Sequence, residues 1–370
     1  MNQHPVKTAV VGCGKISDIY FQNMIEKYET LEVVACCARG MESAVRQGTK
    51  YGVKPCTFEE ILADRDVEML VILTPAPTHF GLIKQGLLAG KHVYTEKPIA
   101  TSVEEAAELL RLATDRGLYL GAAPETFLGS AVQTARKAID DGLIGEVTSF
   151  HVTANRDLSF LASFFRFLRM PYGGICYDYG VYYLTALVSL LGPMQQVFGV
   201  VKNRSRIRIN SLPQSPEYGQ EYIYDNESQT DAILTTESGV TGTFALNGDS
   251  IPVDLGAFTI YGTKGVLRLG DANQFGGEIQ LIPHDLRAIH EGVKPVTLEP
   301  VNDLNENARG IGPADMARAI REGGQARTSK ELACHVLDIV EQIMKSSETG
   351  SARMISTTCS RPDFFDGKLS

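Results

Sequence analysis

The first 122 residues alternate between short apolar runs and longer segments whose apolar positions recur at helical spacing. In the last of these segments Ser102 stands where a helix cap is expected. The pattern predicts strands at Thr8–Val11, Leu31–Cys37, Met69–Leu73, His92–Thr95 and Leu118–Gly121, and helices at Ile16–Tyr28, Glu42–Tyr51, Thr78–Ala89 and Val103–Arg116. Such alternation with short links predicts right-handed βαβ units, and near-continuous apolar strands predict a parallel sheet covered on both faces.

The pattern changes at about residue 123. Predicted helices at Ser130–Asp141, Asp178–Leu191 and Glu331–Ser346 are now separated by a series of strand-like runs. These predicted strands are Val147–Thr153, Gln196–Val201, Ala232–Thr236, Thr241–Leu246, Ala257–Tyr261, Val266–Leu269 and Ile279–Ile282. Glycine-rich turns between the later strands predict an antiparallel meander with one face partly open. We therefore expect an α/β domain over residues 1–123 and an α+β domain over residues 124–370.

Composition narrows the classes of partner. A chain of 370 residues favours two domains, and a net charge of −9 without a block of like charges argues against nucleic acid and anionic membranes. The seven cysteines form no Cys-x-x-Cys pair, so we expect reduced thiols in a cytoplasmic protein. Residues 1–7 lead directly into a strand, so no signal peptide is expected, and no apolar run is long enough to span a membrane.

A glycine-rich turn at residues 12–17 follows the first predicted strand and precedes the first predicted helix. A dinucleotide phosphate-binding turn requires that context. Gly12 permits a tight turn and Gly14 allows the backbone to approach a pyrophosphate, which the helix amino end then faces. Ser17, where a third small residue is usual, is small enough for close packing. The predicted cofactor-binding residues here are Gly12, Gly14, Lys15 and Ile16; the alternative is an ordinary strand–helix turn.

The end of the second strand predicts which dinucleotide is bound. An acid there binds the ribose 2′-hydroxyl of NAD, whereas an arginine suits the 2′-phosphate of NADP. Ala38 occupies the place of the acid, Arg39 follows it, and the first acid is Glu42. We predict that Ala38 and Arg39 contact the cofactor and that NADP is preferred. The alternative is a solvated Arg39 and a pocket that accepts NAD as well.

The stretch Thr95-Glu96-Lys97-Pro98 ends the fourth predicted strand. The carboxyl ends of such strands are where the reactive ring of a dinucleotide lies. A lysine fixed there by the following proline can donate a hydrogen bond to a reacting oxygen and exchange its proton, with Glu96 as an orienting partner. The alternative is a surface loop with two charges and a proline.

Several motifs, in this order and spacing, resemble the glucose–fructose oxidoreductase / inositol dehydrogenase / rhizopine catabolism (Gfo/Idh/MocA) family. They are Gly12-x-Gly14, Thr74-Pro75-x-x-x-His79, Glu96-Lys97-Pro98, Gly173-Gly174 and Asp178-x-Gly180-x-Tyr182. The resemblance covers essentially the whole chain. It implies a doubly wound Rossmann domain followed by a domain with a large, mostly antiparallel open sheet, which commonly forms dimer or tetramer contacts.

The resemblance also implies site residues. It places Lys97 at the substrate beside the nicotinamide, and the loop of Thr74, Pro75 and His79 against the nicotinamide. Glu96 is expected beside the cofactor as well. For His79 the alternative is a histidine at a helix start. The other histidines are scattered without paired ligand spacing, so no catalytic metal is expected. Three arginines lie in an irregular stretch and suit either an anionic substrate or a solvated loop: Arg156, Arg166 and Arg169.

The chain departs from the family pattern in its Asp-x-Gly element. Tyr172, Tyr182 and Thr185 replace a glycine, a histidine and an aspartate of the usual inositol-dehydrogenase-like pattern. A tyrosine at position 182 resembles glucose–fructose oxidoreductase and the dimeric dihydrodiol dehydrogenases, relatives that favour NADP. This agrees with the preference predicted from Ala38 and Arg39.

Asp178 and Tyr182 are four residues apart, so on a helix they share a face. Gly180 inside that helix suggests a close approach by a ligand or by backbone. We predict that Tyr182 and Lys97 form the acid–base pair, because a neighbouring lysine cation lowers a phenol pKa, and that Asp178 binds a substrate hydroxyl. The alternatives are that Tyr182 is a packing residue or that Tyr179 or Tyr183 faces the site instead.

The sequence thus predicts an NAD(P)-dependent oxidoreductase, acting on a secondary alcohol or carbonyl of a sugar, cyclitol or related diol. We expect a homodimer or homotetramer formed through the C-terminal sheet, with neither nucleic acid nor membrane as a partner. Two other hypotheses remain open. One is an enzyme that retains its cofactor and uses transient oxidation to cleave glycosides or to couple two sugars. The other is a non-catalytic dinucleotide sensor.

Overall fold

The computed structural model describes residues 4–251, 256–284 and 292–369. It divides into two compact units, which are described separately. The first unit comprises Met1–Leu128, Asn307–Leu337 and Lys368–Ser370, and the second comprises Gly129–Glu306 and Asp338–Gly367. Residues 1–3, part of the segment expected to lead into the first strand, lie outside the described residues.

The first unit is built on a six-stranded sheet in the order β3-β2-β1-β4-β5-β6. Every pair of neighbouring strands is parallel. The strands are β1 (Val6–Val11), β2 (Leu31–Cys37), β3 (Lys54–Pro55), β4 (Met69–Ile72), β5 (His92–Thr95) and β6 (Leu120–Ala122). The order reverses between β1 and β4, as in doubly wound folds, which confirms the predicted α/β class.

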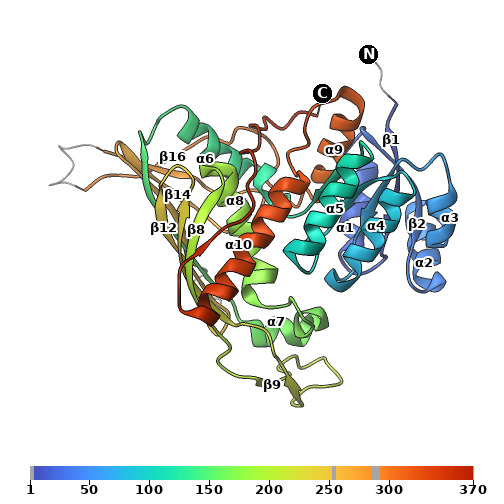
Figure 1. The fold of residues 1–370 in the computed structure, drawn as a ribbon, viewed down its shortest axis with the longest axis horizontal. Coiled ribbons are helices and arrows are strands. Elements are labelled where there is room, and N and C mark those ends of the chain that lie inside the picture. Colours follow the sequence, from blue (N-terminus) through green and yellow to red (C-terminus); the bar gives the residue numbers. More distant parts are fainter. Residues whose placement is uncertain (1–3, 252–255, 285–291, 370) are drawn as a thin grey trace. The chain divides into compact units, whose positions relative to one another are not determined.

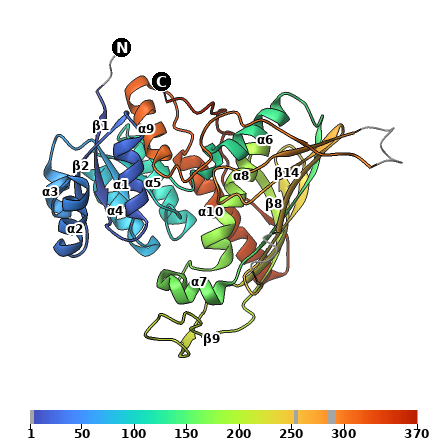
Figure 2. The ribbon, with the colours of Figure 1, turned by 180° about the vertical axis from the view of Figure 1, so that it is seen from behind.

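Helices cover both faces of this sheet, as the opposite views of Figures 1 and 2 show. They are α1 (Ser17–Glu26), α2 (Met41–Tyr51), α3 (Phe58–Ala63), α4 (His79–Leu88), α5 (Val103–Asp115) and the late α9 (Ile311–Glu322), with short 3₁₀ turns η1 (Ala76–Thr78) and η2 (Thr126–Leu128). Ser102 caps α5 by accepting a hydrogen bond from the Glu105 N–H, as predicted. The sequence pattern predicts neither β3 nor α3, and it places no helix at α9.

The second unit contains a nine-stranded sheet in the order β16-β15-β14-β13-β7-β12-β11-β8-β17. Its strands are β7 (Val147–Asn155), β8 (Met194–Lys202), β11 (Gln229–Thr236), β12 (Thr241–Asn247), β13 (Gly256–Gly262), β14 (Gly265–Leu269), β15 (Gln280–Pro283), β16 (Val296–Thr297) and β17 (Arg353–Met354). The mostly antiparallel sheet confirms the predicted α+β class. The meander is interrupted, however, because β7 lies between β12 and β13 and runs parallel to β12.

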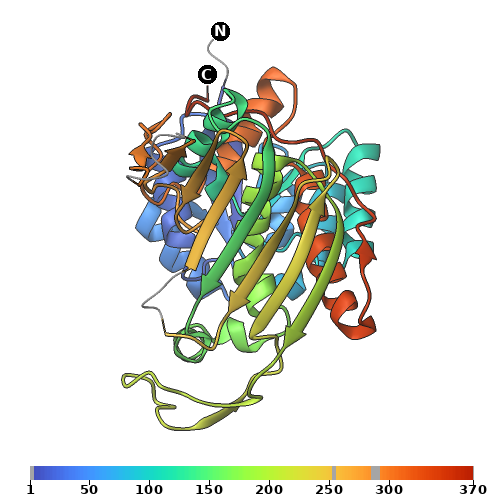
Figure 3. The same ribbon diagram turned by 90° about the vertical axis from the view of Figure 1, so that its left-hand side faces the viewer.

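The two faces of this sheet differ in character. One face buries side chains such as Phe150 and Phe244 beneath α6 (Ser130–Asp140) and α8 (Val181–Leu191). The other face leaves Phe198 and Ile233 exposed by 42% and 50%, and Figure 3 looks onto it without an intervening helix. The long helix α10 (Lys330–Thr349) begins in the first unit and continues into the second.

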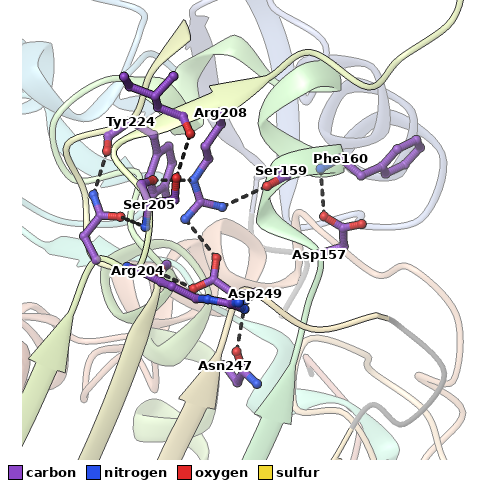
Figure 4. A network of polar contacts seen from close by, with 12 residues as sticks. Asp157, Ser159, Phe160, Arg204, Ser205, Arg208, Tyr224, Asn247 and Asp249 are labelled. Atoms are coloured by element: carbon purple, nitrogen blue, oxygen red, sulfur yellow. Dashed lines mark hydrogen bonds and ion pairs between the residues drawn. The ribbon is translucent and has the colours of Figure 1, made fainter. Parts of the chain in front are cut away.

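A hairpin of β9 (Ile207–Ile209) and β10 (Glu221–Ile223) extends from the second unit beside α7 (Leu158–Phe164) and the 3₁₀ turn η3 (Arg166–Arg169). Buried Arg208 anchors it, as Figure 4 shows. The guanidinium pairs with Asp249 (2.9 Å), donates to Ser159 Oγ (3.0 Å) and lies 4.3 Å from the centre of the Tyr224 ring. These contacts fix one face of a two-stranded element that is only marginally stable alone.

Two further properties concern the cysteines and the hydrophobicity of the helices. All seven cysteines are buried free thiols. Among the described residues, no helix combines the length and apolar character needed to cross a membrane.

Candidate functional site

The glycine-rich turn has the geometry that its sequence predicts. Gly12 adopts a φ of 110°, which favours glycine, and its N–H donates to Cys37 O (2.8 Å). A Cβ at this position would lie 2.9 Å from the backbone carbonyl of Leu73. Only glycine therefore allows β1 to turn this closely beside the end of β4.

Gly14 serves a different purpose from Gly12. A Cβ on Gly14 would meet nothing within 4 Å, so the backbone here borders open space. Ser17, at the start of α1, donates to Gly14 O through its N–H (3.1 Å) and its hydroxyl (2.6 Å). Lys15 and Ile16 lie between them, at the amino end of the helix. Open backbone before a helix amino end fits the pyrophosphate of a dinucleotide.

Beyond β2, Ala38 is half-buried and Arg39 is exposed. A second cation, Arg46 of α2, also acts on this region. A hydrogen bond with Cys36 and, to a smaller extent, the charge of Arg46 lower the pKa of Cys13, against the opposing effect of burial. Cys13 lies within the glycine-rich turn, so the positive charge of Arg46 reaches that turn.

His79, the first residue of α4, is completely buried and joins two loops. Its Nδ1 lies 2.7 Å from Pro98 O and its Nε2 lies 2.7 Å from Thr74 O. Burial lowers the pKa of His79, and a neutral imidazole donates to only one of these carbonyls at a time. His79 therefore links the loop of Thr74 and Pro75, after β4, to the loop of Lys97 and Pro98, after β5.

Glu96 fixes the backbone at the end of β5. Its Oε1 accepts from the Tyr20 hydroxyl (2.9 Å), and its Oε2 accepts from the Lys97 N–H (3.1 Å). The Glu96 N–H donates to Ile72 O (2.8 Å), which ties the same residue to β4. Lys97 is half-buried, and its peptide bond to Pro98 is cis. The base of the lysine side chain is thus held by hydrogen bonds from two neighbouring elements.

In the second unit, Asp178 and Tyr182 lie on one continuous helix. The helix begins with a single π-helical turn, η4 (Cys176–Gly180), and continues as α8. Asp178 is half-buried and Tyr182 is 9% exposed. Turns of π-helix inside longer helices occur frequently at functional sites, which is consistent with the role predicted for Asp178.

Glu227 occupies the amino end of this helix. Its Oε1 accepts from the N–H groups of Cys176 (3.0 Å) and Tyr177 (3.3 Å). Burial, aided by the charge of Asp178, raises the pKa of Glu227 to about 7 against the effect of its backbone hydrogen bonds. A Cβ on Gly174 would lie 1.9 Å from Glu227 Oε2, so the glycine makes room for the carboxyl group.

The neighbouring phenols of Tyr179 and Tyr183 are bound to Asp271. Their hydroxyls donate to Asp271 Oδ1 at 2.5 Å and 3.0 Å. The same carboxylate pairs with Arg156 (2.6 Å), whose guanidinium lies 3.9 Å from the centre of the Tyr179 ring. Arg156 is therefore part of an internal ion pair, whereas Arg166 and Arg169 both pair with Glu217.

Local geometry explains the residue types at positions 180 and 172. A Cβ on Gly180 would approach Leu246 Cδ1 to 2.8 Å and Phe244 Cζ to 3.1 Å, so the close neighbours are side chains of the sheet. The close approach suggested from the sequence was to a ligand or to backbone. Tyr172 has a φ of 69°, which explains why the family pattern has glycine at this position.

Comparisons with known proteins agree with this architecture. Residues 6–123 match the model of an oxidoreductase family with an NAD-binding Rossmann fold, and residues 132–268 match the GFO/IDH/MocA C-terminal domain. The chain belongs to the Gfo/Idh/MocA oxidoreductase family. The resemblance stated from the motifs is thereby confirmed.

Individual members of the Gfo/Idh/MocA family are moderately similar. The dTDP-3,4-didehydro-2,6-dideoxy-alpha-D-glucose 3-reductase of Actinomadura kijaniata is 30% identical over 65% of this chain and 68% of its own. The scyllo-inositol 2-dehydrogenase (NADP(+)) of Bacillus subtilis is 23% identical over 93% and 94%. A solved levoglucosan dehydrogenase, in complex with NADH and L-sorbose, superposes with a TM-score of 0.82 over 95% of this chain and 99% of its own, at 20% identity. The chain spans just over half the length of the first curated relatives that it matches, two uncharacterized oxidoreductases of Schizosaccharomyces pombe.

Within the first unit, two predicted cofactor-binding residues, Gly12 and Thr74, and the predicted catalytic residue Lys97 lie at the ends of neighbouring strands. Gly12, Thr74 and Lys97 follow β1, β4 and β5, which are adjacent parallel strands. Asp178 and Tyr182 belong to the second unit.

Four residues that support these segments were missed from the sequence: Tyr20, Glu125, Glu227 and Asp271. Each acts through partners far along the chain, so no local motif marks it. For Glu227 alone the sequence offers a signal, Gly173-Gly174, since paired glycines before a helix indicate a close neighbour.

Proposed function

We propose that this protein transfers a hydride between a nicotinamide cofactor and a secondary alcohol or carbonyl of a sugar, cyclitol or related diol. The observation that supports it most strongly is the placement of Gly12, Thr74 and Lys97 at the carboxyl ends of adjacent strands around the reversal of strand order. Ligands of doubly wound sheets bind at that point. The names of the bacterial relatives, a dTDP-sugar reductase and an inositol dehydrogenase, support the substrate class.

The cofactor would be held by the glycine-rich turn, with Lys15 and Ile16 at the helix amino end, and by the Thr74–Pro75 loop. When bound, its nicotinamide supplies the hydride acceptor or donor. Ala38 and Arg39, together with the nearby cation of Arg46, support a preference for NADP over NAD. Glu96 and His79 hold the backbone beneath the nicotinamide end of this site.

For the proton we propose Lys97 and Tyr182 as the acid–base pair, with Asp178 as the ligand of a substrate hydroxyl. Lys97 is supported by its fixed position after β5. Tyr182 is supported by the hydrogen bonds that tie the Tyr179 and Tyr183 phenols to Asp271. The pairing itself rests on the family pattern, because the two residues lie in different units.

The open face of the second unit's sheet supports assembly of identical subunits. Phe198, Val200 and Ile233 are exposed there on adjacent strands, and an apolar patch on a large sheet is typical of a contact surface. We propose a homodimer or homotetramer formed through this face. The buried free thiols support a reducing compartment, so we also propose a cytoplasmic location.

Cofactor binding is tested first. Titration of the purified protein with NADPH and NADH, followed by nucleotide fluorescence, should show tighter binding of NADPH. Arg39→Ala should weaken NADPH binding and leave NADH nearly unchanged, because only NADPH has a 2′-phosphate. Tighter binding of NADH to the unmodified protein would contradict the NADP preference.

Turnover is then sought across a panel of sugars, cyclitols and diols. With a substrate in hand, Lys97→Met should lower kcat by about 10²–10⁴-fold, the usual contribution of a positioned acid–base group. Lys84→Met is the matched control: Lys84 pairs with Glu108 on the surface of the same unit, so activity should hold. Normal turnover by Lys97→Met would sink the proposed chemistry. Turnover without net change in the nucleotide would indicate the cofactor-retaining cycle.

A further inference from the structure

Glu125 is a buried acid to which the proposed chemistry assigns no role. It follows β6 and is 2% exposed. Both carboxyl oxygens face donors: Oε1 accepts from the Gly310 N–H (2.5 Å), and Oε2 accepts from the Tyr94 hydroxyl. A Cβ on Gly312 would lie 2.4 Å from the Tyr94 hydroxyl oxygen and 2.5 Å from Glu125 Oε2. The glycine at position 312 therefore leaves space for the Glu125–Tyr94 pair.

The contact to Tyr94 leads to the end of β5. Tyr94 lies in β5, and Glu96 directly follows the last residue of that strand. Glu96 holds the Lys97 N–H and receives the Tyr20 hydroxyl. Glu125 therefore acts, through Tyr94, on the segment that ends in Lys97.

Several ionisable groups face Glu125 from the elements packed against it. Besides Tyr94 and Glu96 they are Tyr20 and Tyr28 from the α1 side, and Arg309 from the returning segment. Burial raises the pKa of Glu125 to about 7, and Glu96 adds to this; Tyr94, Gly310 and Arg309 oppose it. The carboxyl group accordingly changes its charge near neutral pH.

The charge state of Glu125 decides how strong these hydrogen bonds are. An ionised carboxylate accepts from both donors at once, and charge-assisted hydrogen bonds are roughly twice as strong as neutral ones. A neutral carboxyl group still accepts from Gly310, but it donates its own proton to the Tyr94 oxygen in a weaker, uncharged hydrogen bond. The ionised form is therefore the one that holds Tyr94 and Gly310 more tightly.

We propose that Glu125 is a positioning residue of the reaction, whose ionised carboxylate fixes Tyr94 and thereby the strand end from which Lys97 acts. This inference rests on the proposed function of Lys97. As the pH falls through the titration of Glu125, the hold on β5 weakens and kcat declines.

The test compares kcat, KM and cofactor binding of the full chain across the pH range, using the substrate found by the panel. The unmodified protein should show a rise in kcat centred near pH 7. Glu125→Gln cannot ionise, so its kcat should lack that rise. Above pH 7 it should be lower by about tenfold, within the range that a small misplacement costs, with KM and the Kd for NADPH nearly unchanged.

The matched control is Tyr28→Phe, which removes a buried phenol hydrogen bond to Ala308 O in the same cluster (2.8 Å). It should retain the profile of the unmodified protein. Should Glu125→Gln fail to fold, Tyr94→Phe provides a second test. It removes the hydroxyl through which Glu125 acts on β5, so the rise in kcat near pH 7 should be lost.

Profiles of the unmodified protein and Glu125→Gln that have the same shape would overturn the proposal, as would a rise in kcat near pH 7 that persists in Tyr94→Phe. Lys97→Met separates this failure from that of the proposed function. If Lys97→Met is inactive while the Glu125→Gln profile matches that of the unmodified protein, only the role of Glu125 fails. If Lys97→Met turns over normally, the proposed function fails, whatever Glu125 shows.

Discussion

Glu125 in the first unit and Glu227 in the second are buried glutamates whose pKa burial raises to about 7. Each holds the segment on which a candidate functional residue lies. Glu227 accepts two consecutive N–H groups at a helix amino end, next to residues close in sequence to Asp178. Glu125 joins the Tyr94 phenol to the Gly310 N–H, which lies 185 residues beyond Glu125 in the chain. Glu227 therefore holds a helix terminus, whereas Glu125 depends on a distant segment, residues 307–337, that belongs to the same unit.

The largest effect should come from Gly174→Ala. The added methyl would overlap the Glu227 carboxyl group, since the Cβ position lies about 2 Å from three of its atoms. We expect a loss of about 3 kcal/mol or more in the free energy of unfolding, at the upper end of overpacking effects. Denaturant unfolding would measure it.

Gly81→Ala is the control for that substitution. Gly81 is exposed within α4 and has open space around its Cβ position, so alanine should stabilise the helix by up to about 1 kcal/mol. Equal effects of the two substitutions would remove the claim that Glu227 requires a glycine beside it.

A second effect concerns the pH dependence of stability. Between pH 4.5 and about 7 the native chain retains protons on both glutamates that the unfolded chain has released. Their contribution to stability is fully present below the lower value and is lost as the pH rises to about 7, by roughly 3 kcal/mol for each residue.

Glu125→Gln and Glu227→Gln should each remove their own part of that decline, as urea unfolding at a series of pH values would show. The partial positive charge at the helix amino end favours the ionised form of Glu227 and so opposes the rise in its pKa. If only one variant changes the slope, the two glutamates are not equivalent and the comparison breaks at that point.

The smallest effects separate support of the site from support of the fold. Tyr20→Phe removes the phenol that donates to Glu96, and Tyr179→Phe removes one that donates to Asp271. Each should cost about 1 kcal/mol of stability. Only Tyr20→Phe should also lower kcat, by a few-fold, because Glu96 holds Lys97. Thermal unfolding and steady-state kinetics of both variants would decide this, and a matching fall in kcat for Tyr179→Phe would argue against the distinction.

The sequence predicted those parts of the molecule whose causes are local. The strand–helix alternation, the Ser102 cap and the glycine turn all follow from residues close together in the chain. The position of β7 between β12 and β13 was missed, because sheet order depends on pairing between distant segments. The β9–β10 hairpin was missed because its strands are three residues long and are held by Arg208, whose carboxylate partner is 41 residues away.

The candidate site divides in the same way. Gly12, Lys97, Asp178 and Tyr182 were found because motifs and family resemblance mark them. The polar groups around them were not, since Tyr20 meets Glu96 across 76 residues and Tyr179 meets Asp271 across 92. Burial of an acid such as Glu125 depends on the packed fold and has no signature in its neighbours along the chain.

The return of residues 307–337 to the first unit also bears on the order of events during synthesis. When the ribosome has released the sheet β1 to β6, the main-chain partner of Glu125 has not yet been made. The nascent first unit cannot form that hydrogen bond until β7 to β16 have emerged. This buried hydrogen bond therefore forms late, and a chain that stalls before residue 310 would be left with an incomplete core for proteases to recognise.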